Sequence, residues 1–176
     1  VPVHFAGAPC DLTRLGRLAD DCGAVVVEDA AHALPASHAG RRIGSIGHAT
    51  VFSFYAGKNI TTGEGGMVTT DDAELAATLR SRRLHGISRD AWKRYTAEGS
   101  WYYEVEARGF KYNLTDIQAA IGIHQLDRLE EFDERRRRIV SIYDELLGDV
   151  PGLALPNPPD RDGCAWHLYV VSVDEE

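Results

Sequence analysis

The stretches VVVEDAAHA at residues 25–33 and TVFSFYAGKNITTGEGG at residues 50–66 decide the fold of this chain. Each begins as a short apolar run, which is typical of a strand buried on both faces of a parallel sheet. Each run is followed by reactive polar groups, Asp29 in the first stretch and Ser53 and Lys58 in the second. Ligands of open α/β sheets bind beyond the carboxyl ends of the strands. We therefore expect these three side chains to share one site.

The residues on either side of these strands predict helices. Apolar residues recur at helical spacing over residues 11–22, with Asp11 placed to cap the start and Gly23 placed to end the helix. Residues 71–86 predict a second helix that begins with a capping box from Asp71 and ends at Gly86. Helices that alternate with short apolar strands indicate an α/β fold.

The second half of the chain predicts a different organisation. A long helix is expected from Thr115 to about Leu147, followed by a linker and by a strand over WHLYVVSV at 166–173. The predicted domains are residues 1–114, part of an α/β large domain with a three-layer sandwich and a mostly parallel sheet, then a connecting helix at 115–150. Residues 151–176 are expected to begin a smaller α+β domain, so the chain is expected to be a piece of a longer protein.

Composition narrows the classes of function. The formal net charge is −8, whereas nucleic-acid and membrane-surface proteins carry a basic excess. No apolar run approaches the roughly 20 residues of a membrane-spanning helix. Three scattered cysteines without a CxxC pair suggest a reducing compartment, so a cytoplasmic location is expected. The seven histidines show no paired spacing on a shared face, and no metal site is expected.

An acid and a lysine that leave neighbouring strands suit a pyridoxal phosphate (PLP) enzyme. Asp29 would hydrogen-bond the pyridine nitrogen, and Lys58 would carry the cofactor as an imine and move the substrate proton. Ser53 and backbone N–H groups of the glycine-rich loop would bind the phosphate. His32 follows Asp29 by three residues and is close enough in sequence to contact the ring.

Each of these residues also has a simpler interpretation. Asp29 could cap a helix that begins at Ala30, Lys58 could be a surface lysine, and Ser53 an ordinary strand residue. The spacing alone does not name PLP. A metal site, a nucleotide-binding glycine motif and a G-x-S-x-G hydrolase motif find no support in the sequence.

The two stretches, together with GFKYNLTDIQAAIGIHQLDRLEEFDERRRRI at 109–139 and AWHLYVV at 165–171, resemble the DegT-type sugar aminotransferases of the fold-type I PLP superfamily. The resemblance covers nearly the whole chain. The strings EDAAHA, SFYAGKNITTGEGG and KYNLTDIQAAI are most similar to the branch that aminates 4-keto nucleotide sugars. UDP-4-amino-4-deoxy-L-arabinose–oxoglutarate aminotransferase and related UDP-4-amino-sugar transaminases belong to that branch.

The resemblance implies a role for each matching residue. Asp29 matches the carboxylate at the pyridine nitrogen, Lys58 the Schiff-base lysine, and Ser53 the serine at the cofactor phosphate. His32 matches a Gln or His that contacts the ring. Asn113 matches an asparagine that reaches the phosphate of the neighbouring subunit's cofactor, which implies a homodimer with a shared active site.

The function implied is amino transfer from glutamate, through PLP, to a 4-keto sugar linked to UDP or dTDP, with 2-oxoglutarate as the other product. A 3-keto nucleotide-sugar aminotransferase is the alternative within the enzyme class. A non-catalytic homologue and an α/β module that binds a phosphorylated ligand remain alternatives outside it. The aromatic residues 101–103 are a candidate contact for sugar or nucleotide. The family's upstream phosphate cradle and most of its C-terminal domain have no counterpart in this sequence.

Overall fold

The computed structural model describes residues 1–87 and 104–174. These residues form two compact units. The first combines Val1–Thr69 with Asp116–Glu176, and the second is Thr70–Thr115. The aromatic residues at 101–103, expected to contact sugar or nucleotide, lie outside the described part of the chain.

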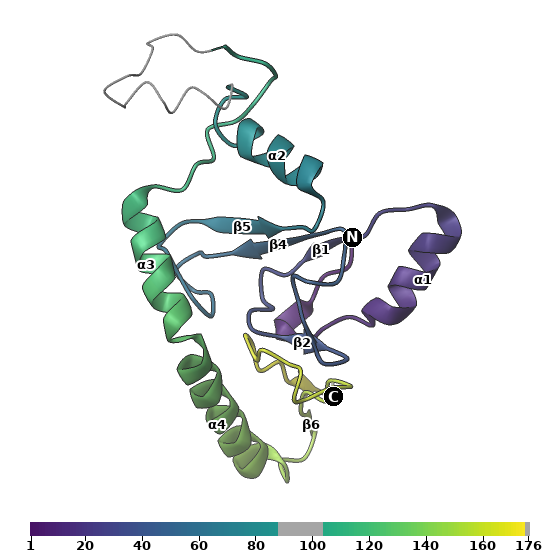
Figure 1. Ribbon diagram of the computed structural model, residues 1–176. Coiled ribbons are helices and arrows are strands. Elements are labelled where there is room, and N and C mark those ends of the chain that lie inside the picture. Colours follow the sequence, from purple (N-terminus) through teal and green to yellow (C-terminus); the bar gives the residue numbers. More distant parts are fainter. Residues whose placement is uncertain (88–103, 175–176) are drawn as a thin grey trace. The chain divides into compact units, whose positions relative to one another are not determined.

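A three-stranded sheet forms the centre of the first unit. Its strands are β1 (Val27–Asp29), β4 (Ala49–Ser53) and β5 (Gly66–Thr69), in the order β1-β4-β5 (Figure 1). The β1–β4 pair is parallel and the β4–β5 pair is antiparallel. Val3 adds an isolated parallel bridge on the other side of β1, at Asp29. The expected α/β fold is confirmed, and the described sheet is mixed.

The first strand is shorter and more polar than its sequence predicts. Val25 lies before β1 and is 69% exposed, whereas Glu28 in the middle of the strand is fully buried. The buried centre of the strand is therefore a carboxylate, whereas Val25 of the apolar run lies outside the strand. Two short strands, β2 (Ser37–His38) and β3 (Arg41–Arg42), form a hairpin in the loop that joins β1 to β4.

Helix α1 (Leu12–Cys22) has both of the caps predicted for it. The side chain of Asp11 accepts a hydrogen bond from the N–H of Arg14, and Gly23 adopts the left-handed conformation with φ of 63°. A left-handed residue after the last turn is favourable for glycine because it has no Cβ. A 3₁₀ turn, η1 (Phe5–Gly7), precedes this helix.

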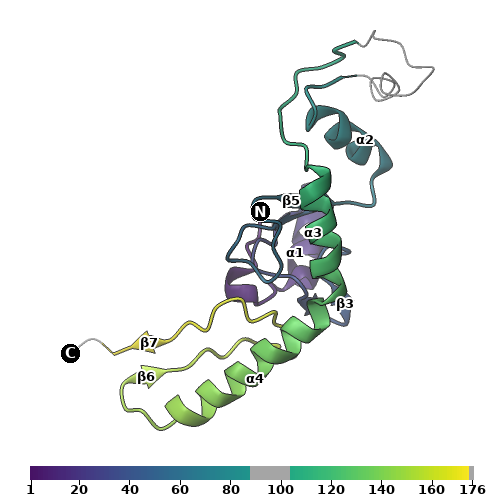
Figure 2. The same cartoon turned by 90° about the vertical axis from the view of Figure 1, so that its left-hand side faces the viewer.

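The single long helix predicted over residues 115–150 is two helices in the structure, α3 (Asp116–Asp127) and α4 (Leu129–Leu147). The N–H of Arg128 bonds the carbonyl of Gln125, three residues back, and this tighter turn breaks the helix. Figure 2 shows the two helices meeting at an angle. Leu129, the first residue of α4, is buried in the core.

The strand predicted over residues 166–173 is mostly absent. Only Ser172–Val173 (β7) pairs as a strand, with β6 (Leu153–Ala154). The backbone N–H groups of Ala165 and Leu168 instead bond the carbonyls of Gly7 and Ala6 in η1. The apolar side chains of this segment pack without a strand ladder, because its backbone partners lie in the N-terminal turn.

The second unit contains helix α2 (Ala73–Arg82). Its N-terminus is capped by Asp72, one residue after the predicted cap Asp71, through the N–H groups of Glu74 and Leu75. The helix also ends before Gly86, which has a φ of 68° and lies against the backbone of Ala107. Gly86 therefore belongs to the turn that follows the helix.

The main core of the first unit gathers side chains from the turns after β1, from β4, and from α1 and α4. Its buried members are Leu12, Ala30, Ala33, Ala36, Ile43, Phe52, Phe54, Ile60, Leu129 and Ala165. None of the described helices is long and apolar enough to cross a membrane.

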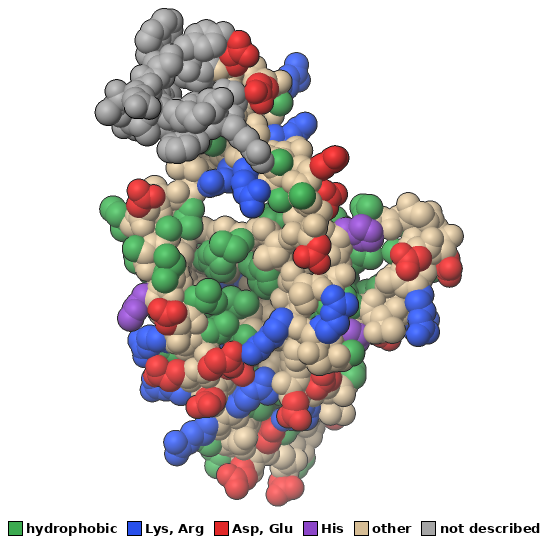
Figure 3. All heavy atoms as spheres, viewed as in Figure 1, with side chains coloured by type: hydrophobic (Ala, Val, Ile, Leu, Met, Phe, Trp, Pro, Cys, Tyr) green, Lys and Arg blue, Asp and Glu red, His purple; other side chains and the backbone are tan. Residues whose placement is uncertain are grey.

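Apolar side chains are also exposed over α3 and the adjoining sheet (Figure 3). They include Val51, Met67, Val68, Ile117, Ile121, Ile123 and Leu126. An exposed apolar surface that joins several elements is typical of an interaction surface.

Candidate active site

Asp29 is the last residue of β1, and its backbone is held from the N-terminal segment. The N–H of His4 donates to its carbonyl at 3.0 Å, and its own N–H donates to the carbonyl of Pro2 at 2.9 Å. Its carboxylate accepts a hydrogen bond from the N–H of Ala31 at 3.0 Å. Residues 30–36 form turns, so the alternative in which Asp29 caps a helix is not found.

Ser53 is the last residue of the neighbouring strand, β4, and Lys58 lies in the turn that follows it. The Ser53 hydroxyl accepts a hydrogen bond from the N–H of Tyr55 at 3.3 Å, which leaves its own proton free to donate. The N–H of Lys58 bonds the carbonyl of Tyr55 at 3.0 Å and closes a tight turn. Asn59 and Ile60, which follow the lysine, are buried and anchor this turn to the core.

His32 connects Asp29 and Lys58 electrostatically. Burial lowers the pKa of His32, the positive charge of Lys58 lowers it further, and the negative charge of Asp29 raises it. Salt screens exposed charges beyond about 10 Å, so groups whose charges act on His32 lie near its ring. The three side chains predicted from two separate stretches of sequence are therefore brought together, at the carboxyl ends of two parallel strands.

Two further residues belong to this cluster and were not predicted, His167 and Asn59. The ring of His167 lies 4.3 Å from the ring of His32, centroid to centroid, at an interplanar angle of 30°. Its Nδ1 lies 2.9 Å from Oδ1 of Asn59. Burial, followed by the charges of His32, Lys58 and Arg136, lowers the pKa of His167 to about 4.

The sequence held a signal for both residues. Asn59 directly follows Lys58, and His167 lies in AWHLYVV, but that segment was interpreted as a strand. Histidines and amides next to a candidate catalytic lysine are reasonable members of a site. Their pairing across 108 positions has no local pattern.

Asn113 lies in the second unit and is half-buried. Near it, the rings of Phe110 and Tyr112 are stacked with their centroids 4.9 Å apart and an interplanar angle of 5°. The N–H of Tyr112 bonds the carbonyl of Arg83 at 2.8 Å. The role of Asn113 at a neighbouring subunit's cofactor stays a prediction.

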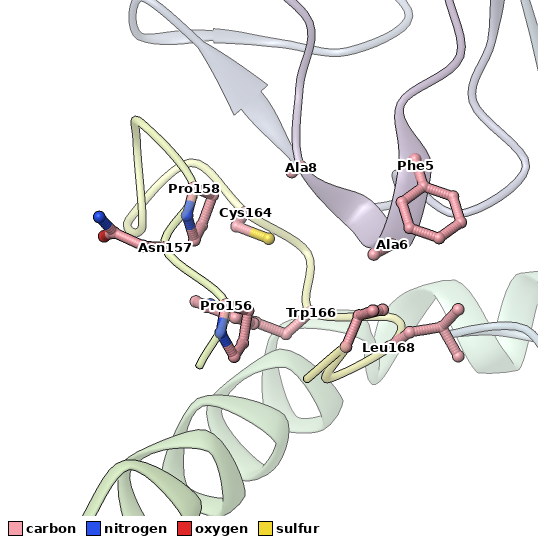
Figure 4. Close-up of a pocket in the computed structure, with 10 residues that line it drawn as sticks. Phe5, Ala6, Ala8, Pro156, Asn157, Pro158, Cys164, Trp166 and Leu168 are labelled. Atoms are coloured by element: carbon pink, nitrogen blue, oxygen red, sulfur yellow. The ribbon is translucent and has the colours of Figure 1, made fainter. Parts of the chain in front are cut away.

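A separate apolar pocket lies between η1 and the segment from 156 to 170 (Figure 4). Its volume is about 230 Å³, and the lining includes Phe5, Cys164, Trp166 and Leu168. None of the predicted site residues lines it. Within residues 1–87 and 104–174, no group of three or more His, Cys, Asp or Glu side chains could hold a metal ion.

A carboxylate and an imidazole come from the end of β1 and the turn after it, and a hydroxyl and an amine come from the end of β4 and the turn after it. A second imidazole, that of His167, comes from the C-terminal segment. The model of the DegT/DnrJ/EryC1/StrS aminotransferase family matches residues 1–176. The chain belongs to this family.

Three relatives show how close the match is. The chain is 53% identical to the spore coat polysaccharide biosynthesis protein SpsC of Bacillus subtilis, over all of this chain and 45% of SpsC. PseC of Helicobacter pylori, an aminotransferase of pseudoaminic acid biosynthesis, superposes with a TM-score of 0.89 at 29% identity. That match covers 98% of this chain and 44% of PseC. DesI, crystallised in the presence of its TDP-sugar product, has a TM-score of 0.81 at 37% identity, over 98% of this chain and 41% of DesI. The chain thus spans less than half the length of these relatives.

Proposed function

We propose that the protein is a PLP-dependent aminotransferase that moves an amino group from glutamate to the keto group of a nucleotide sugar. The substrate class is a 4-keto sugar linked to UDP or dTDP. The observation that carries the proposal is the position of Asp29 at the end of β1 and of Lys58 in the turn after the parallel strand β4, with the charges of both acting on His32. The family match and the TDP-sugar product of DesI support a nucleotide-sugar substrate, and the 4-keto position rests on the resemblance of EDAAHA and KYNLTDIQAAI to the 4-keto branch.

The side chains at this site fit the chemistry of PLP. A carboxylate suits a protonated pyridine nitrogen, an amine suits covalent attachment, and a hydroxyl suits the phosphate. PLP, when bound, supplies an electron sink for the bond changes at the amino-bearing carbon. Asp29, Lys58 and Ser53 provide these three groups from β1, from the turn after β4, and from the end of β4.

Each residue then has a task of its own. Asp29 would hold a proton on the ring nitrogen, aided by the N–H of Ala31, which fixes the orientation of the carboxylate. Lys58 would attach the cofactor through Nζ and carry a proton to and from the substrate carbon. Burial and, after it, the charge on Lys58 lower the pKa of His32, which favours contact with the ring as an uncharged imidazole.

We further propose that the active protein is a homodimer in which Asn113 completes the partner's site. The apolar side chains exposed over α3, β4 and β5 support a buried interface of this kind. Three free cysteines, one of them exposed, agree with a reducing, cytoplasmic location.

The first experiment is an absorbance spectrum of the intact protein after addition of PLP, followed by borohydride reduction and peptide mapping. A near-visible band that is lost on reduction, with the added mass on Lys58, is the expected result. Lys58→Ala should abolish the band, whereas Glu145→Gln, at an exposed position on α4, should retain it. Absence of both band and label would support the phospho-ligand-binding module instead.

The substrate is tested separately, with glutamate and a panel of UDP- and dTDP-linked 4-keto and 3-keto sugars. Formation of 2-oxoglutarate with 4-keto sugars is expected. Turnover of 3-keto sugars alone would replace the proposed substrate with the 3-keto alternative. Covalent PLP binding without turnover of any sugar in the panel would contradict the nucleotide-sugar assignment.

A further inference from the structure

The ring of His32 is positioned by other rings. Its Nδ1 is buried and has no hydrogen-bond partner in the described part of the chain. The rings nearest to it are His167, at 4.3 Å and 30°, and Phe5, at 6.2 Å and 54°. A ring without a directional hydrogen bond takes its orientation from packing, so the contact with His167 sets the plane of His32.

Asn59 is the residue that holds His167. Its Nδ2 lies 2.8 Å from the carbonyl oxygen of Leu34 and 3.0 Å from that of Ala165. A backbone carbonyl can only accept a hydrogen bond, so the Asn59 amide must direct its NH₂ group at both. The direction of this amide is therefore fixed by chemistry, and its Oδ1 faces His167.

This arrangement determines the tautomer of His167. Because Oδ1 of Asn59 is an acceptor, the Nδ1 atom 2.9 Å away must carry the hydrogen and donate it. Nε2 of the neutral ring is then unprotonated. Burial is the main influence that opposes a second proton on this ring, and the electrostatic effects of His32, Lys58 and Arg136 act in the same direction.

Building on the function proposed above, we propose that Asn59 and His167 are positioning residues for His32. Asn59 fixes the plane and tautomer of His167, and His167 holds the plane of His32 by ring packing. Asn59 directly follows Lys58 in the chain. One residue therefore links the turn that would attach the cofactor to the His32 ring that would contact it. The C-terminal segment that carries His167 thereby contributes to the site without touching the reacting atoms.

The test uses ¹⁵N-histidine NMR of the intact protein, as purified and after removal of any bound cofactor. In the wild type at pH 7, His167 is expected to show a protonated Nδ1 and an unprotonated Nε2. The opposite tautomer would overturn the proposal without the need for any variant. The measurement does not depend on catalysis, so failure of the proposed aminotransferase activity and failure of this proposal are distinguishable.

Variants then test separately whether Asn59 orients His167 and whether His167 orients His32. Asn59→Ala should give His167 a mixture of tautomers and shift the ring signals of His32. Asn157→Ala, at an exposed asparagine of the same C-terminal segment, should change neither histidine. Unchanged signals of both histidines in Asn59→Ala would also overturn the proposal.

A pair of substitutions at His167 tests the ring contact. His167→Phe keeps an aromatic ring against His32, so the ring-current shifts of His32 should persist. His167→Ala should abolish these shifts and raise the pKa of His32 toward its ordinary value, because burial of the ring is lost. A His32 signal that is unchanged in His167→Ala would show that another contact sets its orientation.

Discussion

Nε2 of His4 and the carboxylate of Glu28 lie 2.8 Å apart, and both side chains are fully buried. Glu28 directly precedes Asp29 in the chain. Nδ1 of His4 accepts a hydrogen bond from the N–H of Cys10, so its Nε2 carries the hydrogen that is donated to Glu28. The other carboxylate oxygen accepts from the N–H of Gly47 and the hydroxyl of Thr50. The carboxylate is therefore satisfied by donors on three segments, and it fixes the strand that ends in Asp29.

Replacement of Glu28 by Gln should destabilise the protein by about 3 kcal/mol at pH 7. The Gln amide has only one accepting oxygen, so its NH₂ group would face a donor whose hydrogen bond the Glu28 carboxylate now accepts. Urea unfolding of both proteins measures the difference. Glu145→Gln, at an exposed position on α4, should change the free energy of unfolding by less than about 0.5 kcal/mol.

The difference in free energy of unfolding between the wild type and Glu28→Gln should depend on pH. Burial alone would raise the pKa of Glu28, but hydrogen bonds from His4, Thr50 and Gly47 lower it below the ordinary 4.5. A lowered carboxyl pKa stabilises the folded state above pH 4.5, and that stabilisation is lost as the pH falls through the folded-state pKa. The gap between wild type and Glu28→Gln should therefore narrow in acid. A gap that stays constant would show that the carboxylate charge is not what stabilises the fold.

Gly7 should tolerate no side chain. It has a φ of 96°, and a Cβ there would lie 2.9 Å from the N of Trp166, 3.0 Å from the N of His167 and 3.1 Å from the O of His32. These are backbone atoms that cannot move aside alone. Gly7→Ala should destabilise the protein by about 2 to 3 kcal/mol and disturb the packing of His167 on His32.

Gly16 provides the matched control in the same unit. It lies within α1, and an added Cβ would meet nothing within 4 Å. Gly16→Ala should stabilise the protein by up to about 1 kcal/mol, because alanine has less backbone freedom to lose in a helix. Thermal unfolding of the two variants should move the midpoint in opposite directions. Equal effects would contradict the tight contact around Gly7.

The part of the fold predicted from the sequence rests on local patterns. Asp11 and Gly23 bound α1 because a capping side chain and a left-handed glycine act within one turn. Asp29 and Lys58 could be placed together because carboxyl ends of parallel strands lie at one edge of a sheet. Each of these inferences needs only neighbouring residues and the strand direction.

The parts not predicted depend on contacts between distant segments. The run at 166–173 has the composition of a strand, but the N–H of Leu168 bonds the carbonyl of Ala6 in the N-terminal turn. Apolar composition does not indicate where backbone hydrogen bonds go. The Asn59–His167 pair has the same origin, since three helices, α2, α3 and α4, separate the two residues in the sequence. The break at Arg128 was missed because a tight turn between two helices leaves the apolar spacing almost unchanged.

The stability of the folded site should fall in mild acid because of His167. Its pKa is lowered from 6.5 to about 4, so the unfolded chain binds the proton more readily. Stability is therefore expected to decrease as the pH falls from about 6.5 to about 4. His167→Phe lacks this group and should lose less stability between pH 7.5 and pH 4.5. His124→Gln, at an exposed position on α3, should keep the wild-type dependence; identical profiles for wild type and His167→Phe would refute the assignment.

The proposed shared active site predicts that two inactive variants rescue each other. Lys58→Ala removes the lysine from a subunit's own site, and Asn113→Ala removes the residue proposed to reach the partner's site. In a mixed dimer, the Asn113→Ala subunit keeps Lys58 and receives an intact Asn113 from its partner. Its site is complete, whereas the other site lacks both residues.

Unfolding and refolding the variants together at equal amounts should restore about a quarter of the wild-type activity by random pairing. Each variant refolded alone should remain inactive, and light scattering should show dimers in every sample. A mixture that stays inactive although mixed dimers form would place Asn113 in the site of its own subunit.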